Sequence, residues 1–338
     1  MATDLNIAGI SRSGVQGNYS YSVIGSPNKP VSYVDWGDAA RFVNWLHNGQ
    51  PIGAQSQGST ENGAYSLRGA NSQETLNAVS RNAGARWFIP SENEWYKSAY
   101  HQLAAQGGDV DNYWGYATRT NIVPKSDQPP GDPSIQTNVC NYYNDTAFGI
   151  GYNAGYAVSG STTYQSSRNY LTDVGAYTSA PSPYGTFDQG GNVFEWNEAL
   201  ILDAYRGERG GAWANNWFEL QSSERSYYLD PTDFGRSLGF RVATLAGPQF
   251  PGDVNFDNVV DFTDLGILLN NYNQVSTFAS GDFDYSGMVD FTDLGILLNN
   301  YNQSAPTLSP VTAVPEPTTA VLAIFACASM WLLKKRLK

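Results

Sequence analysis

The chain has 338 residues and a formal net charge of −12, with 31 Asp and Glu against 19 Lys and Arg. Nucleic-acid phosphates and anionic lipids repel a net anion, so no nucleic acid is expected among its partners. Calcium is the more natural counterion. The length allows two domains and a tail, at about 100 to 200 residues per domain.

The cysteines and the N-terminus say little about the cellular compartment. Only Cys140 and Cys327 are present, and Cys327 lies in an apolar run, so no disulfide within a domain is expected. Residues 1–27 are polar and contain several glycines, without the basic patch and apolar core of a signal peptide.

Two helices are predicted in the first hundred residues. From Asp35 to His47, apolar residues recur at the spacing of one helix face. A second helix is expected to begin near Ser91, because Ser91 and Glu94 fit a capping box, in which each side chain bonds the other's free backbone N–H. Residues 107–187 are rich in Gly, Asn, Ser and Tyr with few periodic runs, which predicts irregular loops stabilised by bound ions or aromatic stacking.

Six segments, taken in order, carry a resemblance to a known family. They are PVSYVDWGDAA (30–40), RWFIPSENEW (86–95), YGTFD (184–188), GGNVFEW (190–196), RGGAW (209–213) and LGFR (238–241). Together they resemble the sulfatase-modifying-factor family, with its formylglycine-generating-enzyme fold related to C-type lectins. The resemblance implies an α+β, loop-rich domain over residues 28–246. The family's first strands should precede Pro30, and we find little there, so residues 1–27 are interpreted as the remnant of a truncated N-terminus.

The resemblance also implies structural calcium in this domain. The positions matching one family site are the side chains of Asp188 and Glu195 and the carbonyls of Gly191 and Val193, and a second site would use Asn141. Oxygen atoms placed closely around a carboxylate suit a hard ion. The other interpretation is that Glu195 bonds nearby backbone donors. One or two calcium ions are expected here.

The chemistry of the family is where the pattern breaks. Its oxidising members hold copper with two cysteines after the Gly-Gly turn, and Asn215 and Leu220 stand near those positions. No cysteine lies between Cys140 and Cys327, so no copper is expected. Iron-dependent relatives need a histidine cluster, and the only histidines, His47 and His101, are interpreted as charges facing solvent or ending a helix.

Two further features near the Gly-Gly turn leave alternatives open. Glu219, Glu224 and Asp230 near Arg225 offer acid–base chemistry or are ordinary surface charges. Residues 212–218 (AWANNWF) combine aromatic and amide side chains, which suits binding of sugars or peptides and equally suits core packing.

An internal repeat follows the large domain, because residues 252–274 reappear 29 positions later as residues 281–303. Each copy fits a twelve-residue calcium loop, with oxygen ligands at positions 1, 3, 5, 7, 9 and 12. In the first copy these are Asp253, Asn255, Asp257, the Val259 carbonyl, Asp261 and Asp264, and in the second Asp282, Asp284, Ser286, the Met288 carbonyl, Asp290 and Asp293. Two calcium ions are therefore predicted.

One helix follows each loop, so the pair resembles the dockerin repeat and not a full EF-hand. We expect Thr263 and Thr292 to cap these helices, with Phe262 and Phe291 packed over the first turn. The resemblance implies a cohesin-like partner for residues 252–303. The alternative is a calcium-stiffened spacer before an anchor.

The C-terminal sequence predicts a linker over residues 304–317 and a sorting or anchor segment over residues 314–338. Pro315, Glu316 and Pro317 precede an apolar run and a basic end, which predicts a C-terminal transmembrane helix. The arrangement resembles the PEP-CTERM signal of Gram-negative envelopes, which an exosortase processes. Export would be needed first, so a signal peptide is expected upstream of Met1.

These observations favour a surface-displayed, calcium-binding, non-catalytic protein that binds a polysaccharide or peptide ligand or serves a structural role. The enzyme alternative is an oxidase or protein-modifying enzyme of the same family with different site residues. In a further alternative, the dockerin-like pair recruits the large domain into a multiprotein surface complex.

Overall fold

The computed structural model covers the large domain and the repeat pair. The described residues are 9–15, 18–24, 26–51, 53–129, 137–145, 154–226, 229–244, 251–255, 259–274, 281–283 and 288–304. Among them, no helix is both long and apolar enough to cross a membrane. Pro315, Glu316, Pro317 and the predicted transmembrane helix lie outside this part of the chain.

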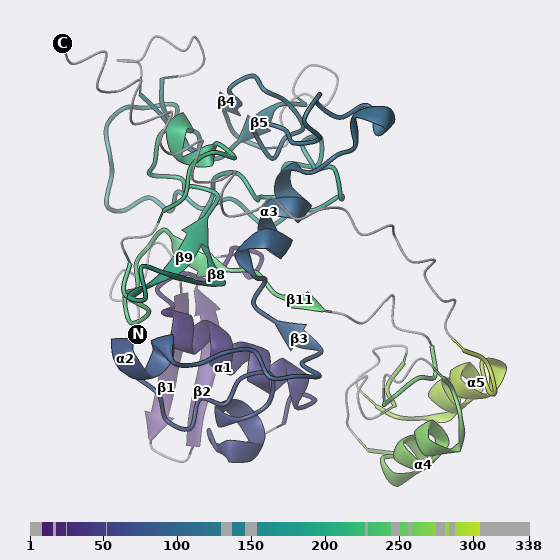
Figure 1. Cartoon of the computed structure of the whole chain (residues 1–338). Helices are drawn as coiled ribbons and strands as arrows, with labels where there is room; N and C mark the ends of the chain where they lie inside the picture. Colours follow the sequence, from purple (N-terminus) through teal and green to yellow (C-terminus); the bar gives the residue numbers. More distant parts are fainter. Residues whose placement is uncertain are drawn as a thin grey trace.

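A β-hairpin opens the described chain. β1 (Gly9–Val15) and β2 (Asn18–Ile24) pair antiparallel along their whole length (Figure 1). Both strands lie within residues 1–27, the segment interpreted from sequence as a remnant.

Both predicted helices of the large domain are confirmed, as α1 (Trp36–His47) and α3 (Glu92–Tyr100). The Ser91 hydroxyl accepts from the Glu94 N–H at 3.2 Å, and the Glu94 carboxylate accepts from the Ser91 N–H at 2.6 Å, as the capping box requires. The shorter helical segments are η1 (Gln57–Glu61), α2 (Gln73–Asn77), η2 (Ala104–Gln106) and η4 (Trp217–Leu220).

A three-stranded sheet of order β10–β8–β9 places the family motifs. β8 (Phe194–Ile201) pairs antiparallel with β9 (Tyr205–Arg209) and parallel with β10 (Leu238–Phe240). Three motif segments far apart in sequence therefore become neighbours.

The remaining strands are two residues long. They pair as β3 (Trp87–Phe88) with β11 (Ala243–Thr244), β4 (Lys125–Ser126) with β5 (Val139–Cys140), and β6 (Tyr143–Asn144) with β7 (Gly155–Tyr156). The loop-rich character predicted for residues 107–187 is thus confirmed for their described part. The main core gathers α1, β3 and the central sheet around buried Trp36, Val43, Ile89 and Trp196.

The two repeats form one unit of their own. α4 (Phe262–Asn270) and α5 (Phe291–Asn299) lie side by side over a shared core (Figure 1). The two repeats exchange backbone hydrogen bonds symmetrically. Val260 N–H donates to the Gln303 carbonyl at 2.9 Å, and Val289 N–H donates to the Gln274 carbonyl at 3.0 Å. Each repeat thus completes the other.

Candidate functional site

Glu195, on β8, is buried and already has strong partners. Its carboxylate accepts from the Trp95 indole at 2.6 Å and from both ends of the Arg241 guanidinium, including Nη2 at 2.6 Å. A paired Arg–carboxylate contact of this kind is strong. A calcium ion at Glu195 would have to compete with Arg241 for the same oxygens.

Asp188 lies just before the turn at Gly190 and Gly191 and has a left-handed backbone conformation, with φ 59°. Its carboxylate accepts from the Gly175 N–H at 2.6 Å. Burial raises the pKa of Asp188 to about 6, and the nearby Glu195 charge adds to the shift. A cation beside Asp188 would reverse this effect, which makes it the better placed of the two carboxylates for calcium.

Gly191 allows the backbone of this turn to approach Asn141. A side chain there would place its Cβ only 2.2 Å from the Asn141 carbonyl, and φ is +84°. That carbonyl accepts from Asn192 N–H at 2.8 Å, while the buried Asn141 amide donates to the Tyr170 carbonyl at 2.8 Å. The structure thus brings Asn141 to the same turn as Gly191 and Val193, and engages its amide in protein contacts.

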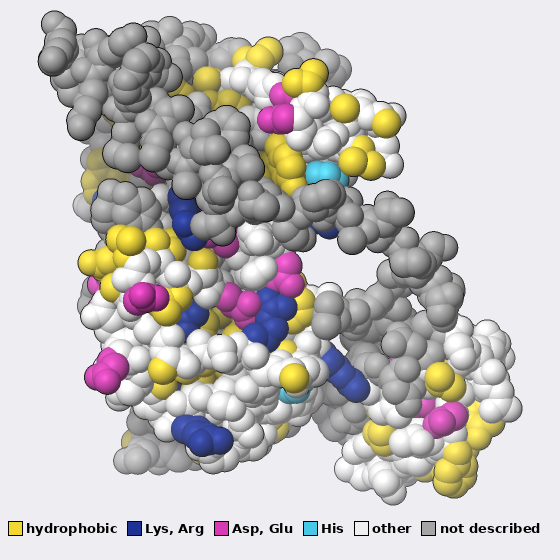
Figure 2. Space-filling view, in the orientation of Figure 1, with side chains coloured by type: hydrophobic (Ala, Val, Ile, Leu, Met, Phe, Trp, Pro, Cys, Tyr) yellow, Lys and Arg dark blue, Asp and Glu magenta, His cyan; other side chains and the backbone are white. Residues whose placement is uncertain are grey.

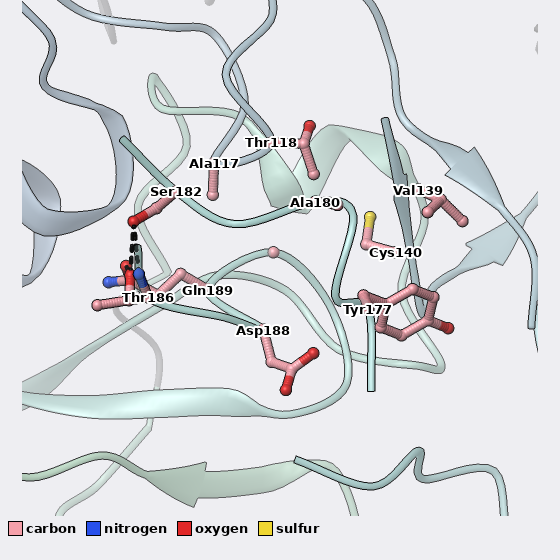
Figure 3. A pocket seen from close by; sticks show the side chains of 11 residues that line it. Ala117, Thr118, Val139, Cys140, Tyr177, Ala180, Ser182, Thr186, Asp188 and Gln189 are labelled. Carbon is pink, nitrogen blue, oxygen red and sulfur yellow. Dashed lines mark hydrogen bonds between the residues drawn. The ribbon is translucent and has the colours of Figure 1, made fainter. Parts of the chain in front are cut away.

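A small cavity of about 10 Å³ lies beside this turn, lined among others by Thr118, Cys140, Tyr177, Asp188 and Gln189 (Figure 3). Such a volume holds about one water-sized particle. Burial raises the pKa of the Cys140 thiol, so Cys140 is not an activated nucleophile. The cavity suits an ion or a water more than a substrate.

Leu220 and Asn215 stand near the positions where the family resemblance implies copper-binding cysteines, and both contact other parts of the protein. Leu220 is buried at 1% exposure in a cluster with Tyr116, Cys140 and Tyr142. The Asn215 carbonyl accepts from the Tyr143 N–H at 2.8 Å. A buried aliphatic side chain and an amide residue do not fit copper, which selects thiolates in this family.

The two histidines and the local carboxylates take other roles. His101 is the C-cap of α3 and is buried, with its Nδ1 2.9 Å from the Tyr184 hydroxyl, so it ends a helix but does not face solvent. His47 accepts from the Arg86 N–H at 3.2 Å, and burial lowers its pKa. Arg225 pairs with Glu92.

Glu219 and Glu224, for which two interpretations were left open, are partly buried. Burial raises the pKa of both, so they are partly withdrawn from water. The Asp230 carboxylate accepts from the backbone and hydroxyl of Thr232, at 2.9 and 2.7 Å.

Five residues form a stacked aromatic cluster, defined as Tyr156, Tyr164, Tyr170, Trp213 and Arg236. The composition of residues 107–187 favoured aromatic stacking but did not identify these partners. Tyr170 lies nearly parallel to Trp213 at 4.9 Å, and Tyr164 is stacked on both. The Arg236 guanidinium lies 4.6 Å above the Tyr164 ring and donates to its hydroxyl at 2.7 Å. Trp213 and Tyr170 are buried, whereas Tyr156 and Tyr164 are partly exposed.

Residues 212–218 combine aromatic and amide side chains, and the sequence left open whether they pack in the core or bind a ligand. The structure supports a different answer for different residues. Trp213 is fully buried and belongs to core packing, while residues 214–218 are partly exposed.

In the repeats, the last predicted ligands are fully buried. The Asp264 carboxylate accepts from the N–H groups of Val254, Asn255 and Asp261, at 2.7, 3.1 and 2.8 Å. Asp293 is buried in the equivalent way and accepts from Phe283 and Asp290.

The first predicted ligands, Asp253 and Asp282, are also buried, at 3% exposure each. Val259 and Met288 form the start of the short segments that cross to the other repeat. Asp257, Asp284 and Ser286 lie outside the described residues. Within the described part of the chain, no group of three or more His, Cys, Asp or Glu is arranged as a metal cluster.

Two details of the repeat helices differ from prediction. Asp261 and Asp290 are the caps, accepting from the N–H groups of Thr263 and Thr292 at 2.7 Å, because an aspartate two residues earlier reaches the free donors. Phe262 and Phe291 do not pack over the first turn but are 76% and 77% exposed. Figure 2 shows hydrophobic side chains on the visible surface of this unit.

The fold and the motif strands define a loop-rich scaffold of mixed α and β structure, in which a small sheet supports the candidate site. The family model "Sulfatase-modifying factor enzyme 1-like domain" matches residues 9–246. The chain therefore belongs to the sulfatase-modifying factor family. The match begins at the β1–β2 hairpin, 19 residues before the predicted domain start at residue 28.

Solved structures are similar to the chain at low identity. The crystal structure of CarF is 19% identical, with a TM-score of 0.38, over 64% of this chain and 68% of that one. Treponema denticola variable protein 1 is 20% identical, with a TM-score of 0.38, over 69% and 74% of the two chains. PvdO from Pseudomonas aeruginosa is 17% identical, with a TM-score of 0.34, over 70% and 71%. A comparison with curated proteins found no match.

Proposed function

We propose that this chain is a non-catalytic member of its family that binds a ligand through the large domain and calcium through the repeats. The observation that carries the proposal is the buried Leu220 near one of the copper-ligand positions that the family resemblance implies, with Asn215 near the other. Leu220 packs where a metal and oxygen would need space. The scaffold is kept while the redox ligands are replaced.

The aromatic cluster supports ligand binding at this same region. Tyr156 and Tyr164 offer partly exposed rings, and Arg236 adds a charged donor over Tyr164. Flat aromatic faces with a few polar groups suit the apolar face of a sugar or a peptide side chain. The proposed ligand is a surface polysaccharide or a peptide.

Calcium binding by the repeats rests on charge. Each loop carries four aspartates, and between Gly252 and Gln303 there is no Lys, Arg or His. Buried carboxylates need compensation, and the segment supplies no cation of its own. Asp253 and Asp264, with Asp257 and Asp261, would hold one ion, and Asp282 and Asp293, with Asp284 and Asp290, the other.

A test of the large domain combines binding and oxygen uptake. We expect Tyr164→Ala to abolish retention of the protein on cell-surface polysaccharide or on a peptide array, while Tyr184→Ala, an exposed aromatic outside the cluster, leaves it unchanged. Oxygen uptake with added copper and a thiol peptide should stay at background. Uptake above background by the unmodified protein would establish the oxidase alternative instead.

Surface display is the remaining part of the proposal. It rests on the apolar run and basic end that follow Pro315, Glu316 and Pro317, with an exosortase-type enzyme as partner. The dockerin alternative is supported by exposed Phe262 and Phe291, which occupy equivalent positions in the two repeats. A cohesin-like partner there would be released by chelation.

A further inference from the structure

A second cavity, of about 280 Å³, lies apart from the aromatic cluster and shares no lining residue with it. Its wall includes Trp36, Tyr65, Asn77, Arg81, Glu198 and Arg206. Trp36, Tyr65 and Arg206 are buried, whereas Ala78 and Ser80 at the rim are exposed. The cavity therefore has a buried polar floor and an accessible edge.

Arg206 is a buried cation that forms no ion pair with any described residue, although the Glu198 charge lies near it. It is 3% exposed, its Nη atoms donate to the carbonyls of Leu76, Val79 and Glu198 at 2.6 to 2.8 Å, and it lies 3.8 Å over the Trp36 ring. Among the described residues, none of the ion pairs includes Arg206. Burial lowers its pKa to about 10, so it keeps its charge at neutral pH. Its Nε is buried without a hydrogen-bond partner.

Asn77 adds the opposite chemistry to the same cavity. Its amide nitrogen donates to the Ala204 carbonyl at 2.7 Å, while its Oδ1 is buried without a partner. Arg206 and Asn77, which both line the cavity, thus each carry one buried polar atom without a hydrogen-bond partner. Leaving such groups unpaired carries an energetic penalty, which a bound molecule would remove.

The surrounding charges argue against an anion. Glu198 lines the cavity, where it accepts from the Tyr65 hydroxyl at 2.5 Å and from Arg81. Arg81 also pairs with Glu94 at 2.6 Å, so these two arginines and two glutamates sum to zero. A carboxylate or phosphate would satisfy Arg206 Nε, but it would meet the Glu198 charge and offer Asn77 no donor. A hydroxyl group both accepts and donates.

We propose that this cavity binds a small neutral polyhydroxylated ligand, of the size of one sugar unit, whose hydroxyl groups form hydrogen bonds with Arg206 and Asn77. The site goes beyond the proposed function, because it is independent of the aromatic cluster and of calcium. The sugar is held by hydrogen bonds on the cavity floor and enters past Ser80.

The test is saturation-transfer NMR on the full chain with glucose, galactose, mannose, acetate and inorganic phosphate as separate probes. At least one of the three sugars is expected to bind. Arg206→Lys, which keeps the charge but removes Nε, and Asn77→Leu are each expected to raise Kd at least tenfold. Arg119→Lys, at an exposed arginine outside both proposed sites, is the matched control and should leave this binding unchanged.

Ser80→Trp narrows the rim of the cavity without changing Arg206 or Asn77. It provides a test if Arg206→Lys or Asn77→Leu does not fold. It should abolish sugar binding. The proposal is overturned where only acetate or phosphate binds, where no sugar binds because water fills the cavity, or where the rim variant binds like the unmodified protein. Loss of polysaccharide retention in Tyr164→Ala with sugar binding intact would keep the two sites distinct.

Discussion

The large domain and the repeat pair are both rich in buried carboxylates, but they neutralise them differently. In the large domain, arginines of the same chain do so: Arg241 pairs with Glu195, and Arg209 with Glu92. In the repeats, Asp264 and Asp293 are fully buried in a segment without Lys, Arg or His.

This difference shows that a buried acid does not by itself indicate a metal site. The decisive question is whether the chain supplies the compensating cation. By that criterion, paired arginines compensate Glu195 and Glu92 in the large domain, whereas we propose that the repeat pair needs an ion from solution.

The largest expected effect is calcium removal. Calcium at about a thousand times its Kd contributes about 4 kcal/mol per site to folding, and chelation withdraws it. We expect calorimetry to show two transitions, of which only the one from the repeats disappears in chelator. Because the repeats contain no tryptophan, tryptophan fluorescence should report an unchanged large domain.

Asp264→Asn is the matched variant for that experiment. It should reproduce the effect of chelation for the repeat unit, because one ion is lost and the two repeats share a core. A repeat transition that persists in chelator would contradict the dependence on calcium.

The next effect is in the large domain. Arg209 donates to Glu92 at 2.6 and 3.0 Å and is almost fully buried. Arg209→Met leaves a buried carboxylate with less compensation, so urea unfolding should show a loss of about 3–5 kcal/mol. Lys29→Met, which breaks the exposed pair with Asp173, is the control and should cost less than about 1 kcal/mol. Equal losses in both variants would refute the contrast.

A pH effect follows from Glu208 on β9. Burial raises its pKa to about 7, and its Oε2 has no hydrogen-bond partner. The folded state therefore binds a proton that the unfolded chain releases above its ordinary pKa of 4.5. Stability falls as pH rises from about 4.5 to about 7, by about 3 kcal/mol, and is level above that.

Glu208→Gln should remove this part of the pH dependence. Urea unfolding of the large domain at pH 5 and pH 8 measures it, and Glu219→Gln, at a less buried carboxylate, should change the slope less. The same pH slope in the Glu208→Gln variant and the unmodified protein would show that Glu208 is ionised in the folded state.

The smallest effect on stability concerns the exposed phenylalanines. Phe262→Ser with Phe291→Ser should change the stability of the repeats by no more than about 0.5 kcal/mol, because both rings are exposed. The same double variant should lose any partner that chelation releases in a pull-down. Leu268→Ala, at a buried position, is the contrasting control and should cost about 2–5 kcal/mol.

Local signals in the sequence predicted local structure well. The capping box at Ser91 and the apolar stripe before His47 specify α3 and α1, because both depend on residues within one turn. The order of the motif segments predicted the family. In the structure, three of these segments lie together in one sheet. The helix caps at Asp261 and Asp290 were missed by two residues, where aspartate and threonine compete for the same donors.

Contacts between distant residues could not be predicted. The stacking of Tyr164, Tyr170 and Trp213, and the pairing of Glu195 with Arg241, depend on loops with no periodicity. Tyr19, Tyr21 and Val23 alternate with serines, a pattern typical of a strand, and they form part of β2. The cavity at Arg206 has no linear signature, because its wall comes from separate segments of the chain.

Elemental analysis of the protein purified without chelator would show which metals it holds. We expect two calcium ions per chain from the repeats, a third only if Asp188 binds one, and no transition metal; Asp188→Ala identifies that third ion. Stoichiometric copper or iron, or a repeat pair free of calcium, would contradict this expectation.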